Sequence, residues 1–417
     1  MKKENNKLTF IDLFAGCGGL SEGFLQSDRY EALAHVEWEK PMIKTLRNRL
    51  ITKWNHTAEE ALKRVIHFDI QKTDELINGN WAKETSELYA KTNHKDIIKD
   101  GIRGLIGKQK VNIIIGGPPC QAYSVAGRAQ DNDLMRNDFR NYLFESFVKV
   151  VDEFKPEVFV FENVPGLLSA CPGGKKVTER IYEAFKNIGY EIRRPELLSK
   201  SVFTASELGV PQKRDRVIII GVRVASKISL ESLYVELHSL KQIVKPKNVF
   251  DAIGHLPKYE PLKTPEKING KKASHKLIGG EKIKFHDARY NNQRDIAIFK
   301  QWLGDNMNNS TSQKKIAFYN DIMGKRSNHS KYRNLEWDKP SPTIVAHLYK
   351  DGLMFIHPDI NQARTITVKE AALLQSFPDD FDFIGSRGFA LKMIGNAVPP
   401  EMARNIAIAI STKILVK

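Results

Sequence analysis

Short apolar runs alternate with amphipathic stretches along the first half of the chain. Runs of about four to eight apolar residues bounded by turn residues predict buried strands, whereas longer stretches with apolar residues at helical spacing predict helices. The expected strands are 8–14, 31–37, 65–70, 111–116, 156–164 and 216–223. The expected helices run from a glycine-rich turn to about residue 28, from about residue 41, over 140–153 and over 178–190.

Strands that alternate with helices predict an α/β fold with a doubly wound, mostly parallel sheet. Ligands bind to such sheets at the carboxyl ends of the strands. The chemically distinctive residues follow these ends, namely Gly16, Glu37, Asp69, Cys120 and Glu162. This edge of the sheet is therefore where we expect the site.

Two other parts of the chain have a different pattern. Residues 71–110 are polar and charged, and we expect them to be helical without assigning them a purpose. After Arg223 the alternation is lost, and residues 224–345 predict a second, irregular domain. Order returns near residue 365, where Thr367 and Glu370 are spaced as a capping box at the start of a helix. A turn and a strongly apolar helix end the chain.

The charge is concentrated in the middle of the chain. The formal net charge is +16, and residues 222–345 contain 23 Lys and Arg against 12 Asp and Glu, a net of +11. This concentration favours a polyanionic partner and a nucleic-acid contact domain. A solvated lysine-rich surface is the simpler interpretation of the same pattern.

Cysteine usage and hydropathy exclude several classes of protein. Cys17, Cys120 and Cys171 are odd in number and have no paired spacing, which argues against a disulfide framework and against a zinc site. No run of 18 apolar residues could span a membrane. The amino-terminal residues lack the apolar stretch of an export signal, so we expect a cytoplasmic protein.

The sequence "DLFAGCGG", residues 12–19, predicts a turn whose backbone amides a ligand can approach at the start of a helix. It matches a dinucleotide fingerprint only in part, because Gly16 and Gly18 fit but Ser21 stands where a third glycine belongs. Glu37 follows at roughly the ~20-residue spacing at which an acid binds ribose hydroxyls. With Asp69, these residues predict a nucleoside pocket, and a simple tight turn remains the alternative.

Two aromatic residues lie beside the predicted pocket. Phe14 and Trp38 could flank an adenine ring, and ordinary core packing explains both equally well. No Lys or Arg follows the glycine turn, so nothing selects a ligand that carries phosphate.

Cys120 lies in the sequence "GGPPCQ" directly after a predicted buried strand. Pro118 and Pro119 fix two φ angles, so the thiol is held with little freedom, as suits a nucleophile. A small buried hydrophobic residue is the alternative. Glu162 ends the next strand, and a thiolate beside a carboxyl group suggests attack on an electron-poor ring whose nitrogen the acid binds.

Two arginines precede the last predicted strand of this region. Arg214 and Arg216 alternate with Asp215, so we expect both guanidinium groups on one face, where they could hold a carbonyl or a phosphate. A surface ion pair with Asp215 is the alternative.

The chain resembles the cytosine-C5 DNA methyltransferases, which use S-adenosylmethionine. Eight sequence blocks carry the resemblance, and they occur in the order of the family. They are "DLFAGCGGL", "VEW", "FDI", "GGPPCQAYS", "FENV", "QKRDRVIIIG", "RTITVKEAALLQSFPDDF" and "IGNAVPP".

The resemblance implies a mechanism and a set of site residues. Cys120 would add to C6 of a flipped-out cytosine, Glu162 would hold the N3 edge, and Arg214 and Arg216 would lie near the base, with Arg216 as its contact. S-adenosylmethionine would supply the methyl group, and no metal is implied. The residues implied to bind the cofactor are Phe14, Gly16, Gly18, Gly19, Leu20, Glu37, Trp38, Asp69, Ile70, Pro119, Leu143, Asn396 and Ala397.

The resemblance also implies the organisation of the chain and its partners. Residues 1–221 would form the catalytic and cofactor-binding domain, 222–364 the smaller, irregular target-recognition domain, and 365–417 a segment completing the catalytic domain. Double-stranded DNA would be the substrate, bound by a monomer, with a restriction endonuclease acting separately. Residues 127–141 resemble the loop that closes over DNA, and Ala126 falls where some members carry a serine.

Three alternatives differ in substrate or class. A tRNA cytosine-C5 methyltransferase would keep the chemistry, but the large basic central domain favours DNA. A catalytically inactive DNA-binding relative is disfavoured by the intact Cys120 and Glu162. A nicotinamide oxidoreductase is disfavoured by Ser21 and by the missing phosphate-binding cation.

Overall fold

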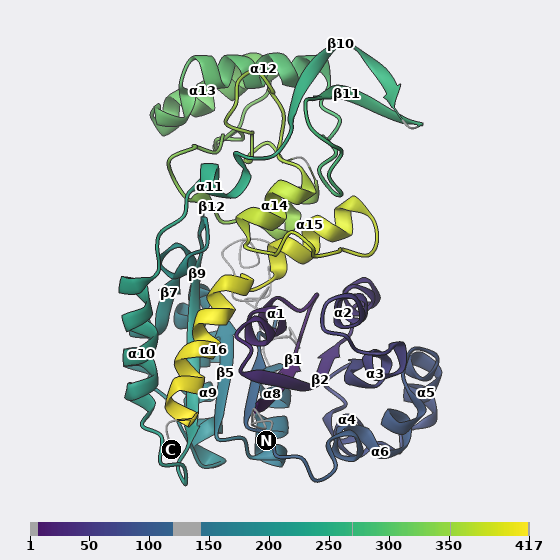
Figure 1. Cartoon of the computed structure of the whole chain (residues 1–417). Coiled ribbons are helices and arrows are strands. Elements are labelled where there is room, and N and C mark those ends of the chain that lie inside the picture. The colour runs from purple at the N-terminus through teal and green to yellow at the C-terminus, as the bar shows by residue number, and fades with distance from the viewer. Residues whose placement is uncertain (1–6, 120–142, 269, 351, 416–417) are drawn as a thin grey trace.

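A mixed sheet forms the centre of the first lobe of the molecule, in a computed structural model that describes residues 7–119, 143–268, 270–350 and 352–415 (Figure 1). Eight strands make up this sheet within the described residues. They are β1 (Leu8–Leu13), β2 (Tyr30–Glu37), β3 (Val65–His67), β4 (Ile113–Gly116), β5 (Val158–Asn163), β6 (Tyr190–Glu191), β7 (Val202–Thr204) and β9 (Asp215–Arg223). The strands expected from the sequence are confirmed, although β3 is shorter than residues 65–70.

The strand order brings the carboxyl ends of five strands to one edge. The order is β3-β2-β1-β4-β5-β9-β6, with β7 also paired to β9. β1 to β5 are parallel, whereas β9 runs antiparallel to β5. The first residues of β9 therefore lie beside the last residues of β5. The mostly parallel, doubly wound sheet expected from the pattern is confirmed.

Helices cover both faces of the sheet, which explains why its central strands are apolar on both sides. One face packs against α1 (Gly19–Gln26), α10 (Leu230–Ile243) and α16 (Pro400–Leu415). The other face packs against α4 (Thr73–Asn78), α6 (Lys95–Ile106), α8 (Leu143–Phe154) and α9 (Val177–Asn187). Beside β2 and β3 lie α2 (Lys40–Thr52), α3 (Ala58–Arg64), α5 (Lys83–Tyr89) and the short η1 (Ala90–Thr92).

The second lobe, residues 244–396, stands above the carboxyl edge of the sheet (Figure 1). It is less irregular than the sequence predicts, because it contains a hairpin and several helices. The hairpin consists of β10 (Lys258–Ile268) and β11 (Lys271–Ile278). The helices are α11 (Val249–Ile253), α12 (Gln293–Gly304), α13 (Ser312–Met323), α14 (Val368–Leu374) and α15 (Arg387–Asn396).

The helices that follow residues 222 and 365 each pack with one of the lobes, and the domain boundaries expected at these residues stay a prediction. α10 follows the first boundary, yet it buries Leu233 and Leu237 in the core of the sheet. α14 and α15 follow the second boundary and share a core with residues of the second lobe such as Ile253 and Ile344. α16 alone of the late helices packs on the sheet, against α1 and α10.

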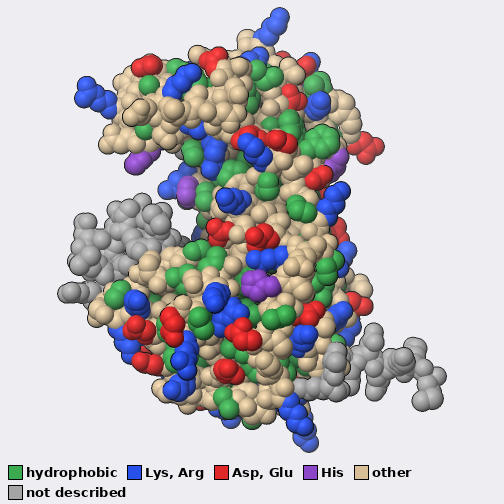
Figure 2. Space-filling model, turned by 90° about the vertical axis from the view of Figure 1, so that its left-hand side faces the viewer, with side chains coloured by type: hydrophobic (Ala, Val, Ile, Leu, Met, Phe, Trp, Pro, Cys, Tyr) green, Lys and Arg blue, Asp and Glu red, His purple; other side chains and the backbone are tan. Residues whose placement is uncertain are grey.

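A recess separates the two lobes on one face of the molecule (Figure 2). Lys, Arg and His side chains gather along its upper edge. The carboxyl edge of the sheet lies at the level of this recess, below the second lobe (Figure 1). The sheet therefore presents its functional edge where a large partner could enter.

Candidate active site

The turn after β1 brings backbone amides to the carboxyl edge of the sheet. Phe14, Gly16 and Gly18 have left-handed φ angles of 59°, 58° and 94°. At Gly18 the φ of 94° disfavours a side chain, and a Cβ atom there would lie 2.6 Å from Leu46 Cδ1 of α2, which would have to move. Gly19 then begins α1. The glycine-rich sequence therefore forms a tight turn packed on α2, as its composition requires.

Glu37, at the end of β2, fixes this turn. Its Oε2 accepts a hydrogen bond from Gly16 N at 2.8 Å, and its Oε1 accepts from Trp38 N and Glu39 N, each at 2.8 Å. The side chain is buried, and burial raises the pKa of its carboxyl group despite these three donors. Glu37 thus joins the glycine turn after β1 to the backbone that follows β2, and both would face a nucleoside.

The two aromatic candidates differ in their surroundings. The side chain of Trp38 is 56% exposed, so core packing does not explain its position. Phe14 is half-buried and packs against the core on the α8 side of the sheet. A large exposed ring next to a buried acid is the kind of surface on which a flat heterocycle can stack.

The remaining cofactor candidates divide into surface and core positions. Asp69 is half-buried, and its carboxylate accepts from Gln71 N at 3.0 Å. Pro119 and Asn396 are exposed, and Ala397 is half-buried. The side chains of Leu20, Ile70 and Leu143 belong to the hydrophobic cores. Only the backbone of these three residues, or an exposed edge, could reach a ligand.

A carboxylate and a guanidinium group meet where β5 and β9 adjoin. Glu162 Oε1 lies 2.6 Å from Arg216 Nε, and both side chains are largely buried. Arg216 also donates to the backbone oxygen of Asp215 at 2.7 Å, whose carboxylate accepts from Thr204 Oγ1 at 2.7 Å. The alternative ion pair between these arginines and the Asp215 carboxylate is therefore not what holds Arg216.

The loop after β4 passes directly beside this pair. A Cβ atom on Gly117 would lie 2.6 Å from Glu162 Oε2, so glycine is required for the carboxylate to lie against the backbone. The close neighbour of this glycine is therefore Glu162. Asn163 Nδ2 donates to Pro118 O at 3.4 Å. Cys120 follows two residues after Pro118 and lies outside the described residues, as does the loop 127–141.

Arg214 has a different environment from Arg216. Its guanidinium is 2% exposed and donates to the backbone oxygens of Ile344, Gly395 and Ala397 at 2.9–3.1 Å. Residue 214 falls between β8 (Gln212–Lys213) and β9, and burial alternates through it, because Lys213 and Asp215 are exposed while Arg214 is buried. The two guanidinium groups have different partners, and their position on one face stays a prediction.

Comparison with known proteins identifies the family. The model of the family described as C-5 cytosine-specific DNA methylase matches residues 8–80 and 76–412. The chain belongs to the C-5 cytosine-specific DNA methylase family.

Curated members of this family resemble the chain over nearly its whole length. The type II methyltransferase M.Bpa9945I of Bacillus paralicheniformis is 33% identical over 96% of this chain and 98% of its own. The type II methyltransferase M1.HphI of Haemophilus parahaemolyticus is 31% identical over 97% of this chain and 86% of its own. The resemblance inferred from the eight sequence blocks is confirmed.

Solved structures share the fold. A putative DNA modification methyltransferase encoded within an E. coli prophage superposes with a TM-score of 0.60 at 23% identity, over 98% of this chain and all of the other. The Dnmt2 methyltransferase of S. pombe gives a TM-score of 0.55 at 14% identity, over 98% of this chain and 99% of the other. The methyltransferase fold of this C-5 cytosine methylase is therefore shown.

The sequence did not reveal the role of Asp12. This residue lies within β1, and its buried Oδ2 accepts from Ser21 Oγ at 2.5 Å. Burial, opposed by this hydrogen bond, raises the pKa of Asp12 to about 7. Ser21, which stands where a dinucleotide fingerprint has its third glycine, binds this acid through its hydroxyl. An acid inside the apolar run "LTFIDLF" was the signal that could have revealed it.

Neither a metal centre nor a membrane segment is found in the described part of the chain. No group of three or more His, Cys, Asp or Glu side chains there could hold a metal ion. No helix among the described residues is long and apolar enough to cross a membrane.

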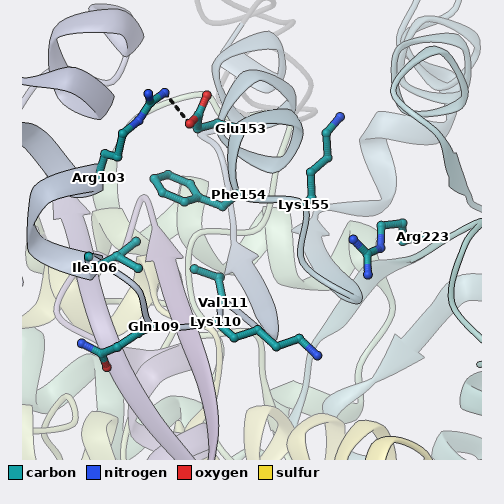
Figure 3. A pocket seen from close by; sticks show the side chains of 10 residues that line it. Arg103, Ile106, Gln109, Lys110, Val111, Glu153, Phe154, Lys155 and Arg223 are labelled. Atoms are coloured by element: carbon teal, nitrogen blue, oxygen red, sulfur yellow. Dashed lines mark hydrogen bonds and ion pairs between the residues drawn. The ribbon is translucent and has the colours of Figure 1, made fainter.

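A cavity of about 440 Å³ lies at the opposite edge of the sheet, near the amino ends of β4 and β5 (Figure 3). Arg103, Lys110, Lys155 and Arg223 contribute to its lining. Lys110 pairs with Glu157 at 2.5 Å, and Arg103 pairs with Glu153, another lining residue. This cavity is therefore separate from the site, and carboxylates offset part of its positive charge.

Proposed function

We propose that this protein transfers a methyl group from S-adenosylmethionine to C5 of a cytosine that has been flipped out of duplex DNA. The observation that carries the proposal is the Glu162–Arg216 pair at 2.6 Å, against which the loop leading to Cys120 packs. Membership of the C-5 cytosine methylase family supports the reaction, and the recess between the lobes supports a large substrate.

The proposed chemistry begins with the thiolate of Cys120, which adds to C6 of the cytosine. Glu162 holds the N3 edge of the ring, so that the electron pair displaced from the C5–C6 double bond is stabilised on the ring and becomes nucleophilic at C5. C5 would take the methyl group as the bond from that methyl to the sulfonium sulfur of the donor breaks and leaves its electrons on sulfur, which gives S-adenosylhomocysteine. The C5 proton would then pass to water. The C–H electrons re-form the double bond, and the sulfur of Cys120 leaves with the electrons of the C6–S bond.

Arg216 has a positioning and electrostatic role in this proposal. Its guanidinium binds Glu162 and keeps the carboxylate directed at one place on the sheet edge. Its positive charge also lies near the base, where electron density develops during the reaction. A preorganised charge stabilises this density with little reorganisation of the site. For Arg214 the contacts with three backbone oxygens support a structural role, joining the residue before β9 to the second lobe at Ile344 and Gly395 and to Ala397 beyond it.

The residues at the glycine turn fit S-adenosylmethionine. Trp38 offers an exposed ring for an adenine, and Glu37 already orients the amides of Gly16 and Trp38 beside it. Asp69 ends the next turn along the edge. No cation lies in the turn, which suits a ligand without phosphate. When bound, S-adenosylmethionine supplies an electrophilic methyl group.

The second lobe would bind DNA. Residues 222–345 carry a net charge of +11, and Lys and Arg side chains line the upper edge of the recess. Phosphate contacts of this kind hold the duplex, whereas a few side chains read base edges in the major groove. Extruding the cytosine costs a few kcal/mol, which these contacts must offset.

The substrate is tested by offering duplex DNA and tRNA separately to the purified protein with radiolabelled S-adenosylmethionine. Bisulfite sequencing of DNA from a host that expresses the gene should show C5-methylcytosine in one short sequence. Methylation of tRNA alone would support the tRNA alternative, and no transfer to either would support an inactive relative. A Cys120→Ser variant is the control for background transfer.

The relatives named as type II methyltransferases favour a role in restriction and modification. We infer that methylation protects the host sequence from an endonuclease that acts separately. Once the methylated sequence is known, DNA from the expressing host should resist endonucleases that cut it. Cleavage equal to that of unmethylated DNA would contradict this role.

A further inference from the structure

The insertion at residues 71–110 closes the free edge of the sheet at β3. The side-chain amide of Asn93 accepts from His67 N and donates to His67 O, each at 2.8 Å. These are the two hydrogen bonds that a neighbouring strand would make. Arg47 of α2 donates to the backbone oxygens of both Val65 and Thr92 at 2.5 and 2.9 Å, so β3 and the insertion are joined twice.

The imidazole of His67 then connects the insertion to Trp38. Its Nε2 lies 3.0 Å from Trp38 O, and its Nδ1 lies 2.6 Å from Thr92 Oγ1. Because a carbonyl oxygen only accepts, Nε2 carries the proton. Burial, together with the nearby charges of Lys40 and Arg47, lowers the pKa of His67 and favours the neutral ring. Nδ1 is then an acceptor, and the single proton of the Thr92 hydroxyl is shared between Nδ1 and Tyr89 O, which lies 2.9 Å from the same oxygen.

Aromatic packing fixes the plane of this imidazole. Tyr89 of the insertion packs edge-on against His67, with ring centroids 5.0 Å apart. Tyr89 also packs on Phe68 at 5.3 Å, and Phe68 packs on Trp81 at 4.6 Å. The ring of His67 is therefore held by the insertion and not by the sheet alone.

The backbone of Trp38 is held on both sides. Its N–H donates to Glu37 Oε1 at 2.8 Å, and its carbonyl oxygen accepts from His67. The indole ring nevertheless stays 56% exposed. An exposed ring on a fixed backbone is preorganised to stack on a ligand, which reduces the entropy lost on binding.

We propose that His67 is a positioning residue, through which the insertion sets the orientation of Trp38 and hence the affinity for the adenosyl end of the methyl donor. The inference rests on the proposed function, because it names S-adenosylmethionine as the ligand. It gives the insertion at 71–110 a purpose that the sequence pattern does not reveal.

Two matched substitutions test the role. Thr92→Val removes the hydroxyl that contacts His67 Nδ1 and Tyr89 O, whereas Thr85→Val removes a hydroxyl of the same insertion that binds Lys72 and Glu75 instead. Calorimetric titration with S-adenosylhomocysteine should give a Kd about 2- to 3-fold higher for Thr92→Val and an unchanged Kd for Thr85→Val. His67→Ala should raise the Kd about 3- to 10-fold, and His67→Gln, which keeps a donor, should restore most of the affinity.

Kinetics separate positioning from a general structural effect. For His67→Ala we expect a higher KM for S-adenosylmethionine, with kcat at saturating donor and the KM for DNA within twofold of the wild-type values. Provided that the wild type binds S-adenosylhomocysteine, two results would overturn the positioning role. One is an equal loss of affinity in Thr92→Val and Thr85→Val, and the other is no loss of affinity in His67→Ala. Failure of the wild type to bind S-adenosylhomocysteine would overturn the proposed function as well.

Discussion

Two buried carboxyl groups lie at the carboxyl edge of the sheet, and the partners of each one fix a different part of the site. Glu162 and Arg216 form one pair at 2.6 Å, and Glu37 binds the glycine turn through its backbone amides. A charged group taken out of water must be compensated locally, so the geometry of each group is set by its partner. The chemistry of the site therefore depends on single contacts that single substitutions can remove.

Replacement of Arg216 tests the pair with Glu162. In Arg216→Lys a compact amine cannot bind both Glu162 and the backbone oxygen of Asp215 as the guanidinium does. We expect kcat to fall about 10²- to 10³-fold, as when one preorganised donor of a developing charge is removed. Affinity for S-adenosylhomocysteine should stay within twofold.

The matched control lies at the other end of the same strand. Arg223 ends β9 at the far edge of the sheet, beside the cavity of Figure 3. Arg223→Lys should therefore leave kcat within twofold. An equal loss of activity in both variants would contradict the role given to Arg216.

Replacement of Arg214 should affect stability. In Arg214→Lys one amine cannot reach the oxygens of Ile344, Gly395 and Ala397 together, and buried acceptors are left without donors. We expect the free energy of unfolding in urea to fall by about 2–3 kcal/mol. Lys213→Ala, an exposed neighbour, should change it by less than about 0.5 kcal/mol. Full stability of Arg214→Lys would show that these contacts do not join the segments.

At the scale of the elements, α14 connects the second lobe to the carboxyl-terminal helices. Its capping box is confirmed, because Glu370 N donates to Thr367 Oγ1 at 3.2 Å and Thr367 N donates to Glu370 Oε2 at 2.7 Å. Glu370 also binds the buried guanidinium of Arg364 at 2.6 Å. A helix of seven residues is too short to be stable alone, so these contacts and packing hold it.

The capping residue of α14 can be tested by a conservative pair. Thr367→Ala removes the hydroxyl that caps the helix, and we expect the free energy of unfolding to fall by about 1 kcal/mol. Thr367→Ser keeps the hydroxyl and should lose less than half of that amount. Urea unfolding of both variants provides the comparison. Equal losses would mean that the methyl group, and not the cap, stabilises α14.

The sequence predicts elements better than it predicts contacts between them. The strands and the capping box can be predicted from local patterns. A strand buried on both faces gives a short apolar run, and a capping box places its two residues at a fixed spacing. The partners of Arg214 could not be predicted, because Ile344 and Gly395 lie 130 and 181 positions further along the chain. The link from His67 to Trp38 depends on residues 25 positions further along the chain, which no local pattern records.

The whole molecule buries several histidines whose neutral form the fold requires. Burial lowers the pKa of His35 to about 3, that of His275 to about 4 and that of His357 to about 3. Burial also lowers the pKa of His286. These side chains lie in both lobes, so their protonation would affect the molecule as a whole.

The stability of the protein should therefore fall as the pH falls below about 6.5. In this range the unfolded chain binds protons at these histidines and the folded chain does not, so unfolding becomes easier. Each of His35, His275 and His357 contributes about 1.4 kcal/mol at one pH unit below 6.5. Asp12, whose pKa is raised to about 7, and Glu37, whose carboxyl pKa burial also raises, act in the opposite direction but are fewer than the four histidines.

Urea unfolding at pH 7.0 and pH 5.5 measures this dependence. We expect a lower free energy of unfolding at pH 5.5. The histidine-to-asparagine variant His357→Asn should show a smaller difference between the two pH values than the wild type, because it has lost one of the titrating groups. Greater stability at pH 5.5 would contradict the assignment of neutral buried histidines.

The central claim is that Cys120 forms a transient covalent bond with an extruded cytosine. Duplex DNA carrying 5-fluorocytosine in the methylated sequence tests it, because fluorine at C5 cannot leave as the proton does and the adduct persists. With S-adenosylmethionine present, we predict a protein–DNA complex that survives denaturation, maps to Cys120 by peptide mass analysis and is absent from Cys120→Ser. A wild-type protein that methylates ordinary DNA but yields no linked complex, or one linked through another residue, would contradict the account.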